Sequence, residues 1–334
     1  MTGGCVADHR DWVAAALGDA GAVATIDVDG VRIHARVWGS ARRPTLLLIH
    51  GGAAHARWWD MIAPLLAPTH RVIAVDLSGH GDSGHREAYS VERWAEEVMA
   101  AAEQLGGRGR PVLAGHSMGG FVAIAAAARH SDRTAGIIVI DSPVRRPTPE
   151  AENEARGAPF FGNPKTYPDR ETAIERFLLV PPQPHADRRL IEHAALTGLQ
   201  QVAGGWTWKF DPGMFRIPAN PIRPAAITAD LCRVDTRLAF VNGQRSELVD
   251  PAVRAHVAEV IEQSHGGRGV PVIEIPEAHH HLMFDRPLEL VTALRTLLAA
   301  WEAAPASPVP ADPTVAARDG RATSASGSVD ALKC

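Results

Sequence analysis

The sequence predicts an α/β protein built on a mostly parallel, doubly wound sheet. Short, continuously apolar runs bounded by turn residues alternate with longer stretches of helical periodicity, a pattern typical of strands joined by crossover helices. The runs lack the polar alternation of half-exposed strands, so we expect both of their faces to be covered. The chain has 334 residues, 46% of them hydrophobic, which is enough for a full core.

The expected elements follow in chain order. Ala24–Gly39 alternates apolar and polar residues around Asp29-Gly30 and predicts a β-hairpin. Buried strands are then expected at Pro44–Ile49, Arg71–Val75, Pro111–Ala114, Ala135–Ile140, Arg237–Val241 and Val270–Ile275. The expected helices are Val91–Leu105, with its apolar side chains on one face, the Ala-rich Phe121–Ala128, and Pro287–Trp301.

The alternation is interrupted once, between residues 143 and 223, where the sequence is irregular and rich in proline and aromatic residues. Because this segment leaves the core after the sixth strand and returns before the next, we expect a lid over the carboxyl ends of the strands. The predicted organisation is an N-terminal extension (1–23), an α/β core (24–142 and 224–303), the lid (143–223) and a disordered tail (304–334).

Composition and charge exclude several classes of partner. The formal net charge is -4 and no run of lysine and arginine occurs, so nucleic acid is not an expected partner. The N-terminus lacks the apolar run of a secretory signal, and no stretch reaches the roughly 18 apolar residues of a membrane span. We therefore expect a cytoplasmic protein that acts on a small molecule.

A serine stands among glycines in Gly115-His116-Ser117-Met118-Gly119, between an expected strand and an expected helix. A strand that runs directly into a helix must turn sharply, and the strained turn leaves its neighbours no room for side chains. The pattern G-x-S-x-G is the nucleophile elbow of acyl-transfer enzymes and predicts Ser117 as a nucleophile. Close packing of helix and strand would also favour small residues, but the strand-turn-helix context favours the elbow.

A second pair of glycines, Gly51 and Gly52, follows the expected strand at Pro44–Ile49. Glycines here allow the backbone to approach a substrate closely. We expect the N–H of Gly52 to form an oxyanion hole with the N–H of Met118, because a developing oxyanion needs converging donors. The alternative is a tight turn after a strand.

Three consecutive histidines, His279, His280 and His281, follow the last expected strand. A histidine there returns to the sheet edge that carries Ser117, and the order nucleophile, acid, histidine is typical of this kind of fold. The residues alone leave all three histidines as candidates for the base. A zinc site is the rival interpretation, but no H-E-x-x-H or C-x-x-C spacing accompanies them, so we predict no metal.

The acid has several candidates. Asp141 directly follows the strand after the nucleophile helix, whereas Glu247 lies beyond the next core strand, with Asp250 as a weaker third candidate. Each also has a structural interpretation, because Asp141 suits a turn cap and Glu247 a solvated loop or a helix start. Only the position of these carboxylates in the fold can decide between them.

Together these motifs resemble the α/β-hydrolase fold family over residues 24–303. The matching segments are HGG at 50–52, DLSGHGDS at 76–83, GHSMGG at 115–120 and HHLMFDRP at 280–287. The resemblance implies that His280 is the base. Most members carry the acid three residues after the glycine that ends the seventh strand, where this chain has Ser246. Members without an acid there place it after the sixth strand, so the resemblance favours Asp141 over Glu247.

The sequence therefore predicts a serine hydrolase that cleaves a carboxylic ester or lactone through an acyl-enzyme intermediate, without a cofactor. Ser117 attacks, His280 moves the proton and Asp141 holds the imidazolium. Trp206 and Trp208, two residues apart in the expected lid, are the predicted substrate-binding side chains. Two alternatives stay open: a C–C bond hydrolase of ring-cleavage products, and a non-catalytic small-molecule receptor.

Overall fold

The computed structural model describes residues 11–152, 164–215, 222–265 and 269–303. Its centre is an eight-stranded sheet with the strand order β1-β2-β4-β3-β5-β6-β9-β10. The strands are β1 (Ala22–Val28), β2 (Val31–Trp38), β3 (Pro44–Ile49), β4 (Arg71–Val75), β5 (Arg108–His116), β6 (Gly136–Ile140), β9 (Arg237–Gly243) and β10 (Val272–Ile275). Strand β2 pairs antiparallel with β1 and β4, and the remaining pairs are parallel. The predicted α/β class with a mostly parallel sheet is confirmed.

The N-terminal hairpin joins β1 to β2 through Asp29 and Gly30. Their φ angles are 52° and 76°, and Val28 pairs with Val31 across the turn. Positive φ at both central residues is typical of the two-residue turn whose twist matches that of the flanking strands. The hairpin begins at Ala22, slightly before the expected position.

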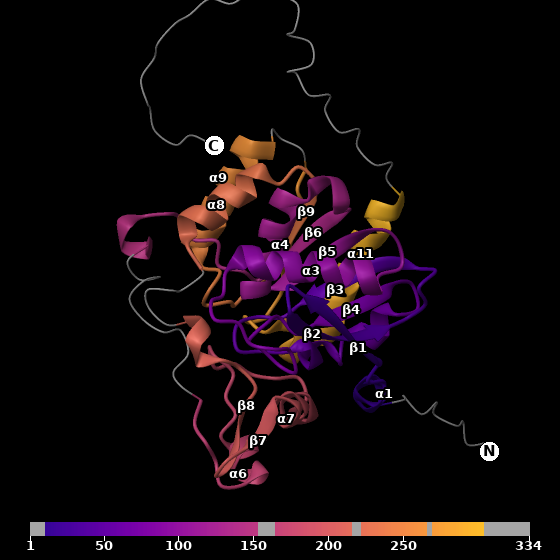
Figure 1. The fold of residues 1–334 in the computed structure, drawn as a ribbon. Coiled ribbons are helices and arrows are strands. Elements are labelled where there is room, and N and C mark those ends of the chain that lie inside the picture. Colours follow the sequence, from indigo (N-terminus) through magenta and orange to yellow (C-terminus); the bar gives the residue numbers. More distant parts are fainter. Residues whose placement is uncertain (1–10, 153–163, 216–221, 266–268, 304–334) are drawn as a thin grey trace, which may run out of the picture.

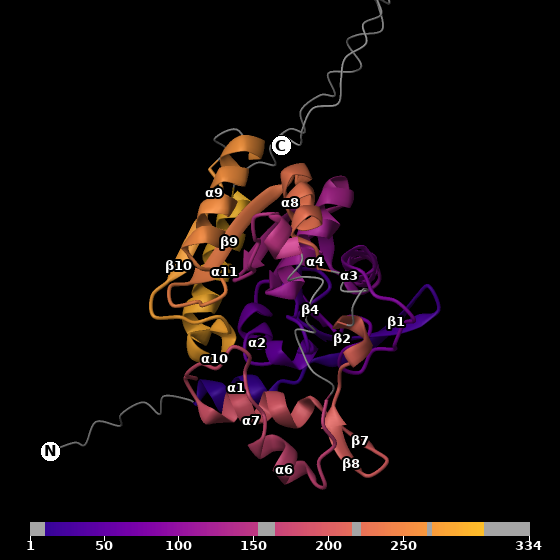
Figure 2. The same ribbon diagram turned by 90° about the vertical axis from the view of Figure 1, so that its left-hand side faces the viewer.

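Helices cover both faces of the sheet, as the continuously apolar strands require. On β3, Leu47 and Ile49 join one buried cluster, whereas Leu46 and Leu48 join the other. The first cluster is closed by α3 (Val91–Leu105), α4 (Met118–Arg129), α8 (Pro224–Arg233) and α9 (Pro251–His265). The second is closed by α1 (Trp12–Gly18), α2 (Ala63–Leu66), α10 (Leu282–Asp285) and α11 (Pro287–Ala303). Figure 2 shows α3 and α4 on one side of the molecule and α11 on the other.

Residues 164–215, between β6 and α8 in the chain, form an insertion at one end of the molecule (Figure 1). Its described elements are α6 (Arg170–Glu175), α7 (Arg188–Thr197), β7 (Leu199–Val202), β8 (Gly205–Trp208) and the 3-10 turn η3 (Pro212–Phe215). Hydrogen bonds join it to the core at separate points: Ala186 N–H donates to the Phe284 carbonyl (2.7 Å), and Gly81 N–H donates to the Lys209 carbonyl (2.8 Å). These elements fall within residues 143–223, the segment predicted as a lid, of which residues 153–163 and 216–221 lie outside the described residues.

An N-terminal extension and a disordered C-terminal tail were also predicted. Part of the expected N-terminal extension is helix α1, whose Val13 and Ala16 are buried against the core. The expected disordered tail, residues 304–334, lies outside the described residues. Across the described stretches, no helix is both long and apolar enough to cross a bilayer.

Candidate active site

Ser117 occupies the sharp turn between β5 and α4. Its φ is 54° and its ψ is -118°, a conformation that L-residues rarely adopt. Backbone strain of this kind costs about 1–3 kcal/mol and persists only where the surroundings enforce it. Here the Ser117 N–H donates to the Ile140 carbonyl at 2.9 Å, which ties the elbow to the end of β6.

The glycines beside Ser117 are required by close backbone contacts. A Cβ added to Gly115 would clash with the Gly119 carbonyl, and one added to Gly119 would clash with the Ile49 carbonyl. The start of α4 therefore presses directly against the ends of β5 and β3. This contact is the structural reason for the G-x-S-x-G spacing.

His280 lies between Ser117 and Asp141. Its Nε2 is 3.2 Å from Ser117 Oγ, and its Nδ1 is 2.7 Å from Asp141 Oδ2. A carboxylate can only accept, so Nδ1–H donates to Asp141 and Nε2 keeps its lone pair toward the serine hydroxyl. Ser117 is partly exposed, whereas His280 and Asp141 are buried. The arrangement suits proton transfer from Ser117 to His280.

Asp141 directly follows β6 and has its carboxylate fully buried. Oδ1 accepts from the Gly243 N–H at 2.8 Å, and Oδ2 accepts from Ser246 Oγ at 2.6 Å as well as from His280. Such donors stabilise an ionised carboxylate away from water. Ser246, at the position where the resemblance leads one to expect the acid, thus supports the carboxylate that hydrogen-bonds His280.

The other two candidate acids lie elsewhere. Glu247 is exposed. Asp250 is exposed as well, and its Oδ1 accepts from the Val253 N–H at 2.8 Å, as an N-cap of α9 does. Glu247 thus fits the solvated loop that was its structural alternative, and Asp250 has a structural role as a helix cap.

The three consecutive histidines have different partners. His279 Nδ1 is 2.9 Å from Asp285 Oδ2, and its backbone N–H donates to the same oxygen. His281 Nε2 lies 3.1 Å from the Val180 carbonyl of the insertion, and its N–H donates to Gln183 Oε1. His280 alone among the three faces both Ser117 and Asp141.

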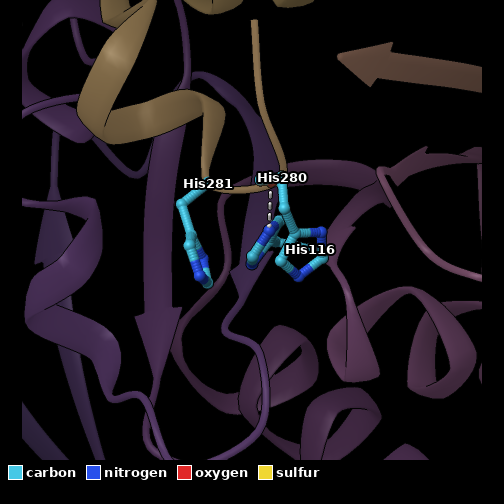
Figure 3. Close-up of side chains that lie close together, drawn as sticks. All are labelled: His116, His280 and His281. Carbon is cyan, nitrogen blue, oxygen red and sulfur yellow. Dashed lines mark hydrogen bonds between the residues drawn. The ribbon is translucent and has the colours of Figure 1, made fainter. Parts of the chain in front are cut away.

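A fourth histidine, His116, holds the loop that carries His280. Its Nε2–H donates to the His280 carbonyl at 2.9 Å, as the dashed line in Figure 3 shows. Burial lowers the pKa of His116 well below its usual range, and the neighbouring His280 and His281 lower it further. Burial, with His280 nearby, also lowers the pKa of His281 well below its usual range. Both rings are therefore neutral near pH 7.

The loop after β3 lies directly against the elbow. A Cβ added to Gly51 would come 3.3 Å from Ser117 Cβ and 3.1 Å from His116 Nδ1. The next residue, Gly52, is partly exposed. Met118 is the first residue of α4, so its N–H has no acceptor within the helix. The two predicted oxyanion donors thus belong to segments that meet at Ser117.

A pocket of about 180 Å³ lies between this loop and the insertion. Its lining includes Gly52, Trp58 and His281 from the core side and Arg176, Phe177 and Trp208 from the insertion. Trp206, the other predicted binding residue, is not among the lining residues, and the Arg170 guanidinium lies 5.9 Å from the centre of its ring. The pocket is mostly apolar, but Arg176 brings a cation to it.

Several residues of the site carried no sequence signal of their own. Ser246 stood out only because it occupies the position where most family members carry the acid, although a hydroxyl there is suited to donate to a carboxylate. His116 lies inside the elbow motif and Arg176 inside the irregular segment, so neither spacing nor periodicity distinguished them. The sequence does not show which distant elements lie side by side in the fold, and these residues join the site only through that pairing.

Two groups of described side chains have the donor atoms to hold a metal ion. They are His116, His280 and His281, and His34, Asp76 and Asp82. In the second group Asp76 already accepts from His34 Nδ1 (2.8 Å) and from the Asp82 N–H (3.0 Å). It therefore fixes the 76–83 turn, which gives that segment a structural role.

Comparison with known proteins places this chain in a family. Residues 46–294 match the α/β hydrolase family. The chain is 26% identical to the esterase Rv0045c of Mycobacterium tuberculosis over 80% of this chain and 86% of that protein. It is also 26% identical to the 2-(acetamidomethylene)succinate hydrolase of Mesorhizobium japonicum, over 77% of this chain and 88% of that one.

Solved structures show the same fold. A crystal structure of E-2-(acetamidomethylene)succinate hydrolase matches with a TM-score of 0.70 at 23% identity, covering 83% of this chain and 99% of that one. The structure of esterase Rv0045c matches with a TM-score of 0.64 at 22% identity, covering 90% and 99%. The family match spans most of the chain and includes both the elbow and the histidine loop, so this protein belongs to the α/β hydrolase family.

Proposed function

We propose that this protein is a serine hydrolase that cleaves a carboxylic ester or lactone through an acyl-enzyme intermediate. The observation that carries the proposal is the hydrogen-bonded chain from Ser117 Oγ through His280 to Asp141, at 3.2 and 2.7 Å. A serine hydroxyl is a weak nucleophile until a neighbouring base takes its proton. His280 Nε2 is that base.

The reaction proceeds in two halves. Ser117 Oγ attacks the carbonyl carbon while its proton passes to His280 Nε2, and the resulting oxyanion is held by the N–H groups of Gly52 and Met118. His280 then gives the proton to the leaving alkoxide, and the acyl group stays on Ser117. Water, deprotonated by His280, releases the acid and restores the serine. Asp141 stabilises the imidazolium throughout.

Two observations support an ester as the scissile group. The first is that a curated relative aligned over most of both chains is named an esterase. The second is the largely apolar pocket beside Gly52, which suits an acyl or alkyl chain. A receptor on the same fold has no need of the hydrogen bond between Ser117 and His280, so the receptor alternative has less support.

The test is hydrolysis of p-nitrophenyl butyrate together with labelling by a fluorophosphonate. Replacing Ser117 with Ala should lower kcat by a factor on the order of 10⁶ and abolish labelling, since the nucleophile is lost. The matched control is Ser131→Ala, which removes a hydroxyl from the η2 turn, Ser131–Arg133, on another part of the surface. Neither turnover nor labelling in the wild type would point to the receptor. Labelling without ester turnover would point to another bond, such as the C–C bond of a ring-cleavage product.

A further inference from the structure

Three imidazole rings gather beside Ser117. The ring centres of His116 and His280 are 4.7 Å apart, those of His280 and His281 are 4.6 Å apart, and those of His116 and His281 are 5.4 Å apart. Figure 3 shows the three side chains together, from the end of β5 and the loop before α10. Each ring offers one nitrogen within 4.8 Å of a nitrogen on each of the others. Serine hydrolysis uses only one of these rings as its base.

The hydrogen bonds of the other two rings fix their tautomers. His116 Nε2 faces the His280 carbonyl and His281 Nε2 faces the Val180 carbonyl. A carbonyl can only accept, so both Nε2 atoms carry the proton and both Nδ1 atoms carry a lone pair. Among the described residues neither Nδ1 has a hydrogen-bond partner, although both atoms are buried. Buried lone pairs without a partner are costly unless something binds them.

We propose that these three histidines form an inhibitory site for a divalent transition metal such as zinc, an inference that rests on the proposed function of His280. Neutral imidazole is a preferred ligand of zinc, copper and nickel, and three imidazoles with an open fourth position is a common zinc arrangement. An ion reaches the site from the pocket, because His281 lines it.

Binding there would stop the reaction at its first step. The lone pair on His280 Nε2 is the one that accepts the proton of Ser117, and a metal coordinated by Nε2 takes that electron pair. No group is then left to deprotonate the serine, and the ion occupies the space beside Oγ. The metal is thus an inhibitor of this site, while catalysis itself uses none.

The geometry is close to what a zinc ion needs. Two nitrogens bound to a tetrahedral zinc at about 2.0 Å are about 3.3 Å apart, so nitrogens that now lie within 4.8 Å of one another must move closer by up to about 1.5 Å. Gly51 favours this, because a side chain there would crowd His116 Nδ1, at 3.1 Å from the added Cβ. The His281 ring makes one hydrogen bond, from Nε2 to the Val180 carbonyl, and its centre lies 5.5 Å from that of Trp58, so one hydrogen bond holds the ring while its Nδ1 stays available to an ion.

The test measures zinc inhibition of p-nitrophenyl butyrate hydrolysis by the tag-free full chain in metal-free buffer. Wild type should be inhibited at micromolar zinc and recover fully when EDTA is added. His281→Gln and His116→Gln should each raise the half-inhibiting zinc concentration at least about tenfold, with each variant's own zinc-free rate as its reference. Using two variants keeps the test decisive if one of them fails to fold.

The matched control is His256→Gln on α9. His256 is also buried, and its Nδ1 also lacks a partner among the described residues, but it lies outside the cluster. This variant should be inhibited like the wild type. Equal inhibition of the wild type and all three histidine variants, or no inhibition of the wild type at millimolar zinc, would refute the proposed zinc site.

Calorimetry separates this proposal from the proposed function. The inactive Ser117→Ala protein should have one more zinc-binding site than the Ser117→Ala/His281→Gln protein. If the wild type hydrolyses no ester, the proposed function fails while this binding comparison still tests the site. If ester is hydrolysed but the two proteins bind zinc equally, the site alone is refuted.

Discussion

The strands that carry Ser117 and Asp141 differ from the hairpin that carries Trp208 in how tightly they are packed. All residues of β6 are buried, and so are the last four of β5. In the insertion, three of the four β7 residues are exposed and all four β8 residues are only partly buried. The insertion meets the core through scattered contacts, such as that between His193 Nε2 and Asp60 Oδ2 at 2.8 Å.

Under the proposed function, the packed strands hold the reacting groups and the insertion selects the substrate. Chemistry requires the atoms of Ser117, His280 and Asp141 to stay within hydrogen-bond reach, and close-packed strands with no room for a Cβ at Gly115 or Gly119 provide that rigidity. Substrate choice requires a surface that adapts to an acyl or alkyl group. A half-buried hairpin provides such a surface, because it has fewer contacts to lose when it moves. Changes in the packed edge should therefore abolish turnover, and changes in the insertion should redirect it.

The largest effect is expected at the packed edge. Asp141→Asn should lower kcat for p-nitrophenyl butyrate on the order of 10⁴-fold, because the amide no longer holds His280 in the tautomer that leaves Nε2 free. Glu247→Gln is the matched control and should keep the wild-type rate, since Glu247 is exposed. Steady-state kinetics measure both. A fully active Asp141→Asn protein beside an inactive Glu247→Gln protein would reverse the assignment of the acid.

A smaller effect is expected in the hairpin. Trp208→Ala should change the preference between short and long acyl esters by about tenfold in kcat/KM, because the ring lines the pocket. Trp206→Ala should leave that preference unchanged and lower the melting temperature by a few degrees, through the loss of about 1 kcal/mol of packing. A series of p-nitrophenyl esters and a thermal melt distinguish the two variants. An unchanged preference in Trp208→Ala would make that tryptophan purely structural.

The smallest effect is expected from the charge at the pocket. Arg176 lines it and forms no ion pair with any described residue, whereas the neighbouring Lys209 pairs with Asp82 at 2.7 Å. Arg176→Gln should lower kcat/KM about fivefold for an ester with a terminal carboxylate and leave a neutral ester of equal length unaffected. Exposed charges act weakly and are screened, so 0.5 M salt should remove most of the difference. Arg170→Gln is the control, and equal losses for both esters would exclude recognition of charge.

Much of the fold was predictable because its causes are local. The expected strands at Pro44–Ile49 and Arg71–Val75 and the helix at Val91–Leu105 match the structure at both ends. Strands covered on both faces must be apolar throughout, and a helix with one buried face must repeat its apolar residues. The glycines around Ser117 were readable for the same reason, since a sharp turn restricts the residues beside it. No such rule governs the insertion, whose irregular sequence predicted neither α7 nor the β7–β8 hairpin.

The sequence by itself determined the kinds of residue at the site: a serine in an elbow, a histidine after the last strand, three candidate acids and two tryptophans. Only the tertiary structure decided which of them meet. Asp141 reaches His280 because β6 lies beside β5 in the sheet, with its end next to the elbow and the Gly243 N–H and Ser246 hydroxyl within reach. Trp208 rather than Trp206 lines the pocket because of how the hairpin docks on the core. These choices depend on contacts between residues far apart in the chain, and neither spacing nor periodicity records them.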